Sequence, residues 1–205
     1  MLQLRRSEGW RQLLMLLLVL AGLQQLAAAG LIKAKAWLAP VLIEQAWAES
    51  LQNAGEPVKP WPWADTWPVA RLRVPAVGID LPVLAGDSGN ALAFGPGHAQ
   101  ASAMLGGRGL AVIGGHRDTH FEFLQYLQPG SRLELQLPDG SWRRYRVHNT
   151  TVADTRVQSL LPDDSREMLL LVTCYPFDAL LANGPLRYVV AALPVVAAAE
   201  AVYAL

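Results

Sequence analysis

The stretch from Val69 to Leu193 consists of short strand-like segments separated by turn residues, and this pattern restricts the fold more than any other feature. Segments 69–74 (VARLRV) and 132–137 (RLELQL) alternate apolar and polar residues, as half-buried strands do. Pro138, Asp139 and Gly140 then provide a turn, and alternation resumes over 141–150, which predicts a β-hairpin. Several short strands of this kind predict a closed barrel or a sandwich.

Three further segments are continuously apolar, which suits central strands of a sheet. They are residues 110–115 (LAVIGG), 167–173 (EMLLLVT) and 186–193 (LRYVVAAL). One helix is predicted over Thr119–Leu127, with Asp118 or Thr119 as its cap, because Phe123, Leu124 and Leu127 would share one face. The β domain is therefore expected to contain mainly strands and one short helix.

The N-terminal region has the length and composition of a membrane anchor. Residues 13–32 are about long enough to cross a bilayer as a helix, and Arg5, Arg6 and Arg11 precede them. Basic residues at that end predict a cytoplasmic N-terminus and an exported C-terminal part. A buried helix of a soluble protein would leave the three arginines without an explanation.

A cleaved signal peptide is the alternative to an uncleaved anchor. Residues 26–30 (LAAAG) resemble a cleavage site with small residues. We favour the uncleaved anchor because apolar residues continue past Gly30. The expected organisation is a cytoplasmic N-terminus (1–12), a transmembrane anchor (13–32), a helix followed by a Pro- and Trp-rich linker (33–68), the β domain (69–193) and an Ala-rich tail (194–205).

Charge and cysteine content exclude several classes of function. The formal net charge is zero, so no basic surface indicates binding to nucleic acid. A single cysteine, Cys174, excludes an internal disulfide and a CxxC zinc or redox site. Three roles remain open for it: a buried inert thiol, an intermolecular link, or a nucleophile.

Cys174 ends one apolar run, and two other reactive groups occupy comparable positions. A cysteine nucleophile needs a nearby positive group, because a free thiol is mostly protonated at neutral pH. His116 ends the run 110–115 after two glycines, which allow close backbone approach. Neighbouring strands would bring His116 and Cys174 to one rim. If the next strand is antiparallel, loop 175–186 returns Arg187 beside the thiol, although a structural arginine in a salt bridge is the alternative.

The other three histidines are weaker candidates for the site. His148 lies in the polar phase of a strand and is expected on the surface. His120 falls in the first turn of the predicted helix, where packing or capping is the expected role. His98 follows a Gly-Pro-Gly loop that can approach a binding groove.

Four segments, in this order and spacing, resemble the sortase family: ALAFGPGH (91–98), AVIGGHRDTHF (111–121), LLLVTCYPF (169–177) and GPLRYVV (184–190). The resemblance extends over roughly residues 69–193. It implies a mainly β fold, a closed barrel of about eight strands with one or two short helices, behind an N-terminal membrane helix. It also implies a membrane-anchored cysteine transpeptidase of the peptidase class.

The resemblance assigns roles to the candidate residues. Cys174 would be the nucleophile, His116 the general acid/base, and Arg187 the group that stabilises the oxyanion or the substrate. His98 is a candidate for substrate binding because of its loop alone, not because of the resemblance. No metal or cofactor is implied. The implied partners are an exported protein with a Leu-Pro-x-Thr-Gly-like sorting signal and an amine acceptor, at the bacterial inner membrane. The anchor and WPWADTWPVARL (61–72) resemble sortases of proteobacterial type, which often act on one dedicated substrate.

Other functions fit parts of the same pattern. An exported cysteine peptidase with water as the acceptor would need the same three residues. A non-catalytic anchored scaffold would use Cys174 as a buried packing residue. Exported L,D-transpeptidases are excluded, because their Ser-His-Gly-Cys cluster is absent from the sequence.

Overall fold

The computed structural model describes residues 2–157, 166–179 and 184–195. The chain divides into two compact units, Met1–Val41 and Leu42–Leu205. The predicted Ala-rich tail lies outside the described residues beyond Val195.

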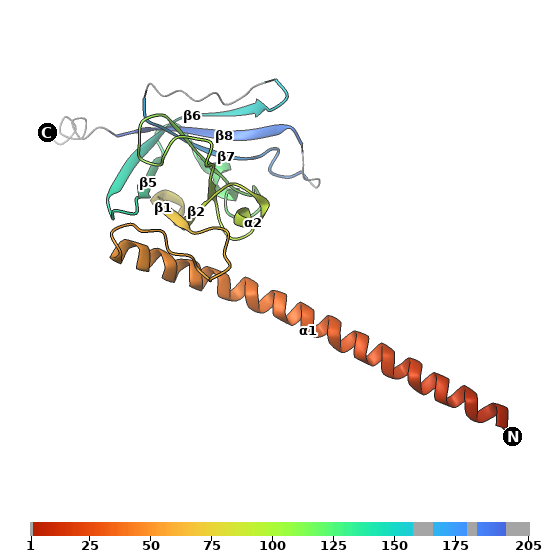
Figure 1. Ribbon diagram of the computed structural model, residues 1–205. Helices are drawn as coiled ribbons and strands as arrows, with labels where there is room; N and C mark the ends of the chain where they lie inside the picture. Colours follow the sequence, from red (N-terminus) through yellow and green to blue (C-terminus); the bar gives the residue numbers. More distant parts are fainter. Residues whose placement is uncertain (1, 158–165, 180–183, 196–205) are drawn as a thin grey trace. The chain divides into compact units, whose positions relative to one another are not determined.

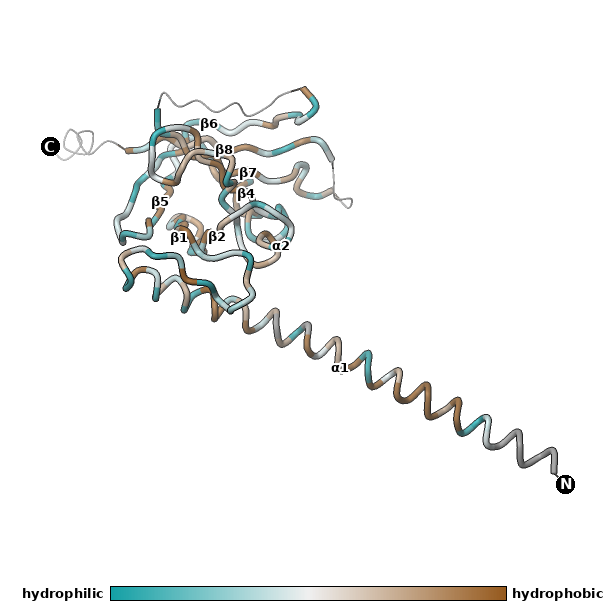
Figure 2. Tube along the Cα trace, in the orientation of Figure 1, coloured by the Kyte–Doolittle hydropathy of each residue, from teal (hydrophilic) through white to brown (hydrophobic). Residues whose placement is uncertain are grey.

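Helix α1 covers Leu2–Gln52 and includes Pro40 within its length. Within the described part of the chain, it is the one helix long and apolar enough to cross a membrane, with a mean hydropathy of 2.0 in its most apolar window. Figure 2 shows hydrophobic residues along much of α1. Length and composition are therefore those of a membrane anchor, as the sequence indicated.

Eight strands form a closed barrel, which confirms the predicted fold (Figure 1). Around the barrel the order is β1-β2-β3-β4-β7-β8-β6-β5. The strands are β1 (Pro68–Val74), β2 (Ile79–Ala85), β3 (Gly97–His98), β4 (Leu110–Gly114), β5 (Arg132–Gln136), β6 (Trp142–Asp154), β7 (Met168–Cys174) and β8 (Leu186–Pro194). The short helices are α2 (Gly89–Leu92) and the 3-10 helices η1 (Pro75–Val77) and η2 (Glu122–Tyr126).

The predicted hairpin is present as the antiparallel pair β5 and β6. In its turn, the Asp139 carboxylate accepts hydrogen bonds from the Ser141 backbone N–H and hydroxyl, at 2.9 and 2.7 Å. Gly140 has a φ of +81°, a conformation that glycine adopts without steric cost. The turn chemistry read from the sequence is therefore the chemistry that connects the strands.

The barrel interior is filled by the inward-facing residues of the strands. Burial alternates along β1 and β4, so that every second side chain points into the core. Apolar side chains are also buried outside the main core. Leu170 of β7, Val189 of β8 and Ala153 of β6 form a separate buried cluster. Leu110, Val112 and Val172 are partly buried against this cluster. Strands β4, β7 and β8 thus have apolar side chains on both faces.

The last turns of α1 belong to the same compact unit as the barrel. Ile43 and Trp47 are buried there. The Glu44 carboxylate forms an ion pair with Nη1 of Arg71 at 2.6 Å, and Arg71 also pairs with Asp80 of β2. This end of the helix is therefore buried in part and is joined to β1 by an ion pair.

The segment between α1 and β1 packs on the barrel through selected residues. The Thr66 hydroxyl donates to the Ala85 carbonyl at 2.7 Å. Trp61 makes an edge contact with Phe94, with ring centroids 5.4 Å apart, whereas Trp63 is 80% exposed. The Pro- and Trp-rich sequence is irregular in structure, as its lack of periodicity predicted.

The predicted helix over Thr119–Leu127 is wrong in type and length. The structure has the 3-10 helix η2, with Phe121 as its N-cap residue and no side-chain capping bond. The Phe121 N–H donates to the His116 carbonyl at 2.9 Å, which closes a turn just before η2. Phe121 and Phe123 are both buried and meet edge to face, with ring centroids 5.7 Å apart. Phe121 is therefore buried from a position just before η2, outside any helix.

Tyr145 contributes a polar contact at the edge of the core. The side chain is 2% exposed, and its hydroxyl donates to Oε1 of Glu167 at 2.6 Å. Burial, reinforced by the neighbouring carboxylate, raises the pKa of Tyr145 above its usual range. The hydroxyl therefore remains a hydrogen-bond donor at neutral pH.

We expect Tyr145→Phe to lower the free energy of unfolding by about 1–2 kcal/mol, because the Glu167 carboxylate loses its donor. Chemical denaturation of the detergent-solubilised full chain measures this. Tyr126→Phe is the matched control, since Tyr126 is 64% exposed, and its effect should stay below about 0.5 kcal/mol. Equal losses in both variants would contradict the role given to this hydrogen bond.

Candidate active site

The ends of β4 and β7 lie at the same rim of the barrel, because these two strands are parallel neighbours. Gly114 is the register partner of Val172, and the Gly115 N–H donates to the Val172 carbonyl at 3.1 Å. His116 follows two residues after Gly114, the last residue of β4, and so lies at the rim where β7 ends in Cys174.

Arg187 lies on the other side of Cys174. Strands β7 and β8 are antiparallel, and Cys174 and Arg187 are register partners. The Tyr175 N–H donates to the Leu186 carbonyl at 3.0 Å, which extends the ladder one residue beyond the pair. Cys174 and Arg187 are therefore paired across β7 and β8, and His116 lies just beyond the end of β4, on the other side of β7. We call these three residues at one rim the row.

The row lies on the outer face of the barrel. Thr173 points inward and is 2% exposed, so the next side chain, Cys174, points outward. Cys174 is a free, half-buried thiol, and His116 is exposed. The inert packing role predicts a fully buried thiol, whereas Cys174 is only partly buried.

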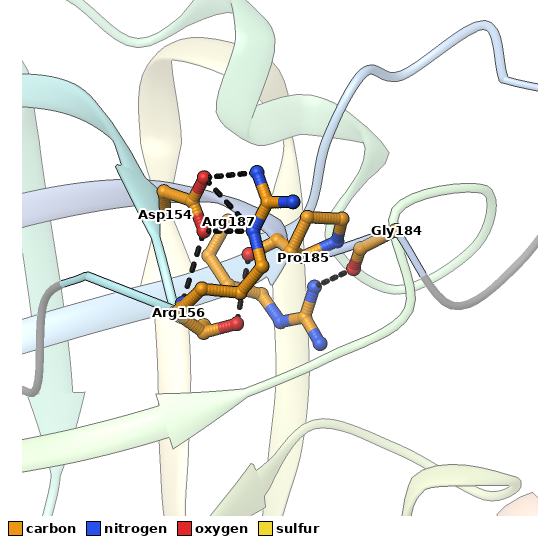
Figure 3. A network of polar contacts seen from close by, with 6 residues as sticks. Asp154, Arg156, Gly184, Pro185 and Arg187 are labelled. Atoms are coloured by element: carbon orange, nitrogen blue, oxygen red, sulfur yellow. Dashed lines mark hydrogen bonds and ion pairs between the residues drawn. The ribbon is translucent and has the colours of Figure 1, made fainter.

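Backbone carbonyls orient the Arg187 guanidinium. Its Nη1 donates to the Gly184 carbonyl at 2.6 Å and to the Leu186 carbonyl at 2.9 Å. Figure 3 shows the contact with Gly184 and, nearby, the ion pair between Asp154 of β6 and Arg156. The N–H groups on Nε and Nη2 take no part in these two hydrogen bonds. Among the described residues, Arg187 forms no ion pair, so the alternative of a salt-bridged strand-edge arginine is not supported.

Gly115 fixes the backbone next to His116. Its carbonyl accepts a hydrogen bond from the Thr173 hydroxyl at 2.7 Å. A Cβ atom at Gly115 would lie 2.7 Å from the Phe121 ring, so only glycine fits there. At Gly114, by contrast, a Cβ would meet only the Gly97 carbonyl oxygen, at 4.0 Å. The close approach predicted for the two glycines occurs at Gly115, and it is made by an aromatic ring.

His98 is not part of the row. It is the register partner of Ile113, below the end of β4, and its Nε2 lies 2.9 Å from the Ala103 carbonyl oxygen and 3.3 Å from the Ser102 hydroxyl. The ring is thus engaged by the loop that follows β3. His148 is exposed at a bulge of β6, as its strand phase predicted.

His120 lies in the turn that begins at His116. Burial lowers the pKa of His120, and electrostatic interaction with the neighbouring His116 lowers it further, whereas Asp118 acts in the opposite direction. The sequence placed His120 in the first turn of a helix, and the structure places it just before η2. Its half-buried ring favours the neutral form.

An apolar strip on the outer face approaches the thiol, and sequence reasoning did not include it in the site. It consists of the partly buried Leu110 and Val112 of β4 and Met168 and Val172 of β7, beside the buried Leu170. The signal was available, because both phases of 110–113 and 168–172 are apolar. Such a strip can bind apolar side chains of an extended peptide.

Two other features separate this rim from alternative sites. A hollow of about 220 Å³ lies on the β5–β6 face, lined by Arg132, Glu134, Arg144 and Arg146 among others, and contains no nucleophile. In the part of the chain that the structure describes, no group of three His, Cys, Asp or Glu side chains could hold a metal ion. The row at the rim is the candidate active site.

Known proteins resemble this chain in sequence and in fold. A family model described as "Sortase domain" matches residues 72–195. Sortase D of Bacillus subtilis (strain 168) is 33% identical over 120 residues, or 58% of this chain and 60% of that protein, which is less than two thirds of its length. Among solved structures, a Clostridium perfringens sortase D5 transpeptidase aligns with a TM-score of 0.60 and 20% identity, over 80% of this chain and 99% of that one. Sortase A from Corynebacterium diphtheriae aligns with a TM-score of 0.56 and 22% identity, over 86% of this chain and 95% of that one.

The lowered pKa of His120 predicts how stability depends on pH. The unfolded chain binds a proton at this histidine near pH 6.5, and the folded protein binds it only at lower pH. As pH falls below that value the unfolded state is protonated first, so stability is lost. The stability of the wild type relative to His120→Gln should therefore decrease from about pH 7.5 to about pH 5.5.

Thermal unfolding at several pH values measures this difference. His148→Gln is the matched control, because His148 is exposed, and its difference from the wild type should not change with pH. A pH-independent difference for His120→Gln would show that the ring is not held in the neutral form.

Proposed function

Because the chain belongs to the sortase family of cysteine transpeptidases, we propose that it cleaves a Leu-Pro-x-Thr-Gly-like sorting signal and transfers the acyl part to an amine. The observation that supports this proposal is the row of His116, Cys174 and Arg187 at the rim where β4 and β7 end and β8 begins. In the proposed roles, Cys174 is the nucleophile, His116 the acid/base and Arg187 the cationic hydrogen-bond donor. These are the groups that acyl transfer through a thioester requires.

In the acylation step, the Cys174 thiolate attacks the carbonyl carbon of the substrate threonine. An S–C bond forms, and the carbonyl oxygen becomes an oxyanion that the remaining Arg187 N–H groups can stabilise. The C–N bond to glycine then breaks. His116 in its protonated form gives a proton to the departing amine, which leaves a thioester on Cys174 and a neutral imidazole.

In the second step, an acceptor amine attacks the thioester. The neutral His116 takes a proton from the attacking amine, the S–C bond breaks, and a new amide forms. Cys174 leaves as a thiolate and His116 is again protonated, so the pair returns to its starting state. Water in place of the amine would give hydrolysis with the same three residues.

The apolar strip supports an extended peptide as the substrate. It reaches Val172, two residues before Cys174 on the same face of β7. A leucine and a proline that precede the cleavage point would cover partly exposed apolar surface there. His98 lies beside β4 and could support this groove only through the loop to which it is bonded.

The proposed location is the bacterial inner membrane, with one transmembrane segment. Helix α1 provides the anchor, and the three arginines before residue 13 favour a cytoplasmic N-terminus. The barrel would then act on exported proteins outside the cytoplasm. A single dedicated substrate, as in sortases of proteobacterial type, is part of this proposal.

The direct test is the thioester. The detergent-solubilised full chain is incubated with a Leu-Pro-x-Thr-Gly peptide and an amine, and the products are identified by mass spectrometry. We expect an acyl adduct on Cys174 and an amide product, and neither of them with Cys174→Ala. Cys174→Ser should keep at most a few per cent of the activity, on the order of 10⁻² of the wild-type rate, because an alcohol is much less nucleophilic than a thiolate at neutral pH.

Two outcomes separate the alternatives. Cleavage without an amide product, at saturating amine, would identify a peptidase. A Cys174 that resists alkylation in the folded protein would identify a scaffold.

His116→Ala should abolish acyl transfer, whereas His148→Ala should retain it. Equal activity of the two variants would remove His116 from the mechanism.

Arg187→Lys tests how the guanidinium acts. Lysine keeps the charge but lacks the planar fork that can hold a backbone carbonyl and an oxyanion at once. We expect both Arg187→Lys and Arg187→Ala to lower the single-turnover acylation rate by about 10²-fold or more, with near-normal melting temperatures. A lysine variant within about threefold of the wild type would show that positive charge alone is enough.

A further inference from the structure

A hydrogen bond joins the loop that carries His116 to the segment that follows Cys174. Nη2 of Arg117 donates to the backbone carbonyl oxygen of Ala179 at 2.6 Å, between residues 62 positions apart in the chain. Arg117 is half-buried and directly follows His116. Ala179 closes a short turn after Cys174, because its N–H donates to the Pro176 carbonyl at 3.4 Å.

A second connection holds the same loop on the other side of His116. The Gly115 N–H and carbonyl are both bonded to β7, to the Val172 carbonyl and the Thr173 hydroxyl. His116 is thus held between two attachments, one to residues before Cys174 and one to a residue after it. Both attachments reach the segment that contains the nucleophile.

His116 depends on these attachments for its position. It is exposed and lies beyond the last residue of β4, so strand pairing does not fix it directly. On its C-terminal side the chain turns at once, because its own carbonyl accepts the Phe121 N–H. A guanidinium that donates to a carbonyl makes a charge-assisted bond, which is stronger than a neutral one.

We propose that Arg117 is a positioning residue of the acyl-transfer reaction: its bond to the Ala179 carbonyl keeps the His116 imidazole beside the Cys174 thiol. This inference rests on the proposed function, since it assumes that His116 exchanges protons at Cys174. Arg117 contacts no reacting atom in this role. It acts through the relative position of two loops, and a displacement of about 1 Å can cost about 10²-fold in rate.

The test replaces Arg117 with methionine, which has a similar length and no donor. We expect Arg117→Met to lower kcat for transpeptidation by about 10- to 100-fold while KM changes by less than about threefold. The melting temperature should remain close to that of the wild type. Arg117→Lys keeps a charged donor on a long side chain and should recover part of the lost rate.

Arg156→Met is the matched control. Arg156 lies near the same rim, but among the described residues its side chain pairs with Asp154, two positions away in the chain. Its replacement removes one positive charge near the rim and should leave kcat within about threefold of the wild type. Equal losses in Arg117→Met and Arg156→Met would overturn the proposal, because charge rather than the loop contact would then be responsible.

High salt concentration provides a second test of whether Arg117 acts through its charge or by positioning His116. At about 1 M salt the screening length is about 3 Å, so a long-range effect of the Arg117 charge on the thiolate would disappear. We expect the kcat deficit of Arg117→Met to persist at this salt concentration. A deficit that vanishes there would overturn the positioning role.

Amide hydrogen exchange tests the contact without any reaction. In Arg117→Met, amides in 116–121 and 175–179 should exchange faster than in the wild type, while those of β5 should not change. Unchanged exchange in both loops would overturn the inference even if activity fell. If the wild type showed no transpeptidation, the proposed function would fail, and faster exchange in the variant would still identify the loop contact.

Discussion

The parallel pairing of β4 with β7 is the constraint on which the candidate site depends. Parallel strands run in one direction, so their C-terminal ends meet at one rim, and here those ends lead to His116 and Cys174. The antiparallel strand β8 then begins at the same rim and presents Arg187. A change of one residue in the register of β7 would turn Cys174 toward the barrel interior and Thr173 toward solvent. The register is fixed by the inward-facing leucines of β7, which are buried in the core.

Much of this arrangement could be predicted from the sequence, because period-2 patterns and turn residues carry strong local information. The hairpin around Pro138–Gly140 and the strands that end near Gly115 and Cys174 follow from such patterns. The common rim of His116 and Cys174 required one further assumption, that the two apolar strands are neighbours. The roles of these residues came from the family resemblance and from chemistry, and they remain proposals.

The parts that sequence reasoning missed depend on contacts between distant segments. Phe121 contacts the backbone at Gly115, and the 3-10 helix η2 begins directly after it, where an α-helix was predicted. The bond between Arg117 and Ala179 joins residues that no local pattern connects. Likewise, the apolar residues on both faces of β4 and β7 predicted fully buried central strands. In the structure, part of their outer face is only partly buried.

The polar contacts around the row have a common feature: their acceptors are main-chain carbonyls. Those of Gly115, Val172, Ala179, Gly184 and Leu186 all serve in this way. A carbonyl is present whichever side chain a residue carries, so divergence at Ala179 or Leu186 removes no acceptor. Side chains around the row can therefore change identity while these main-chain hydrogen bonds are kept. The hydrogen bonding of this rim thus tolerates sequence divergence at the residues that supply its acceptors.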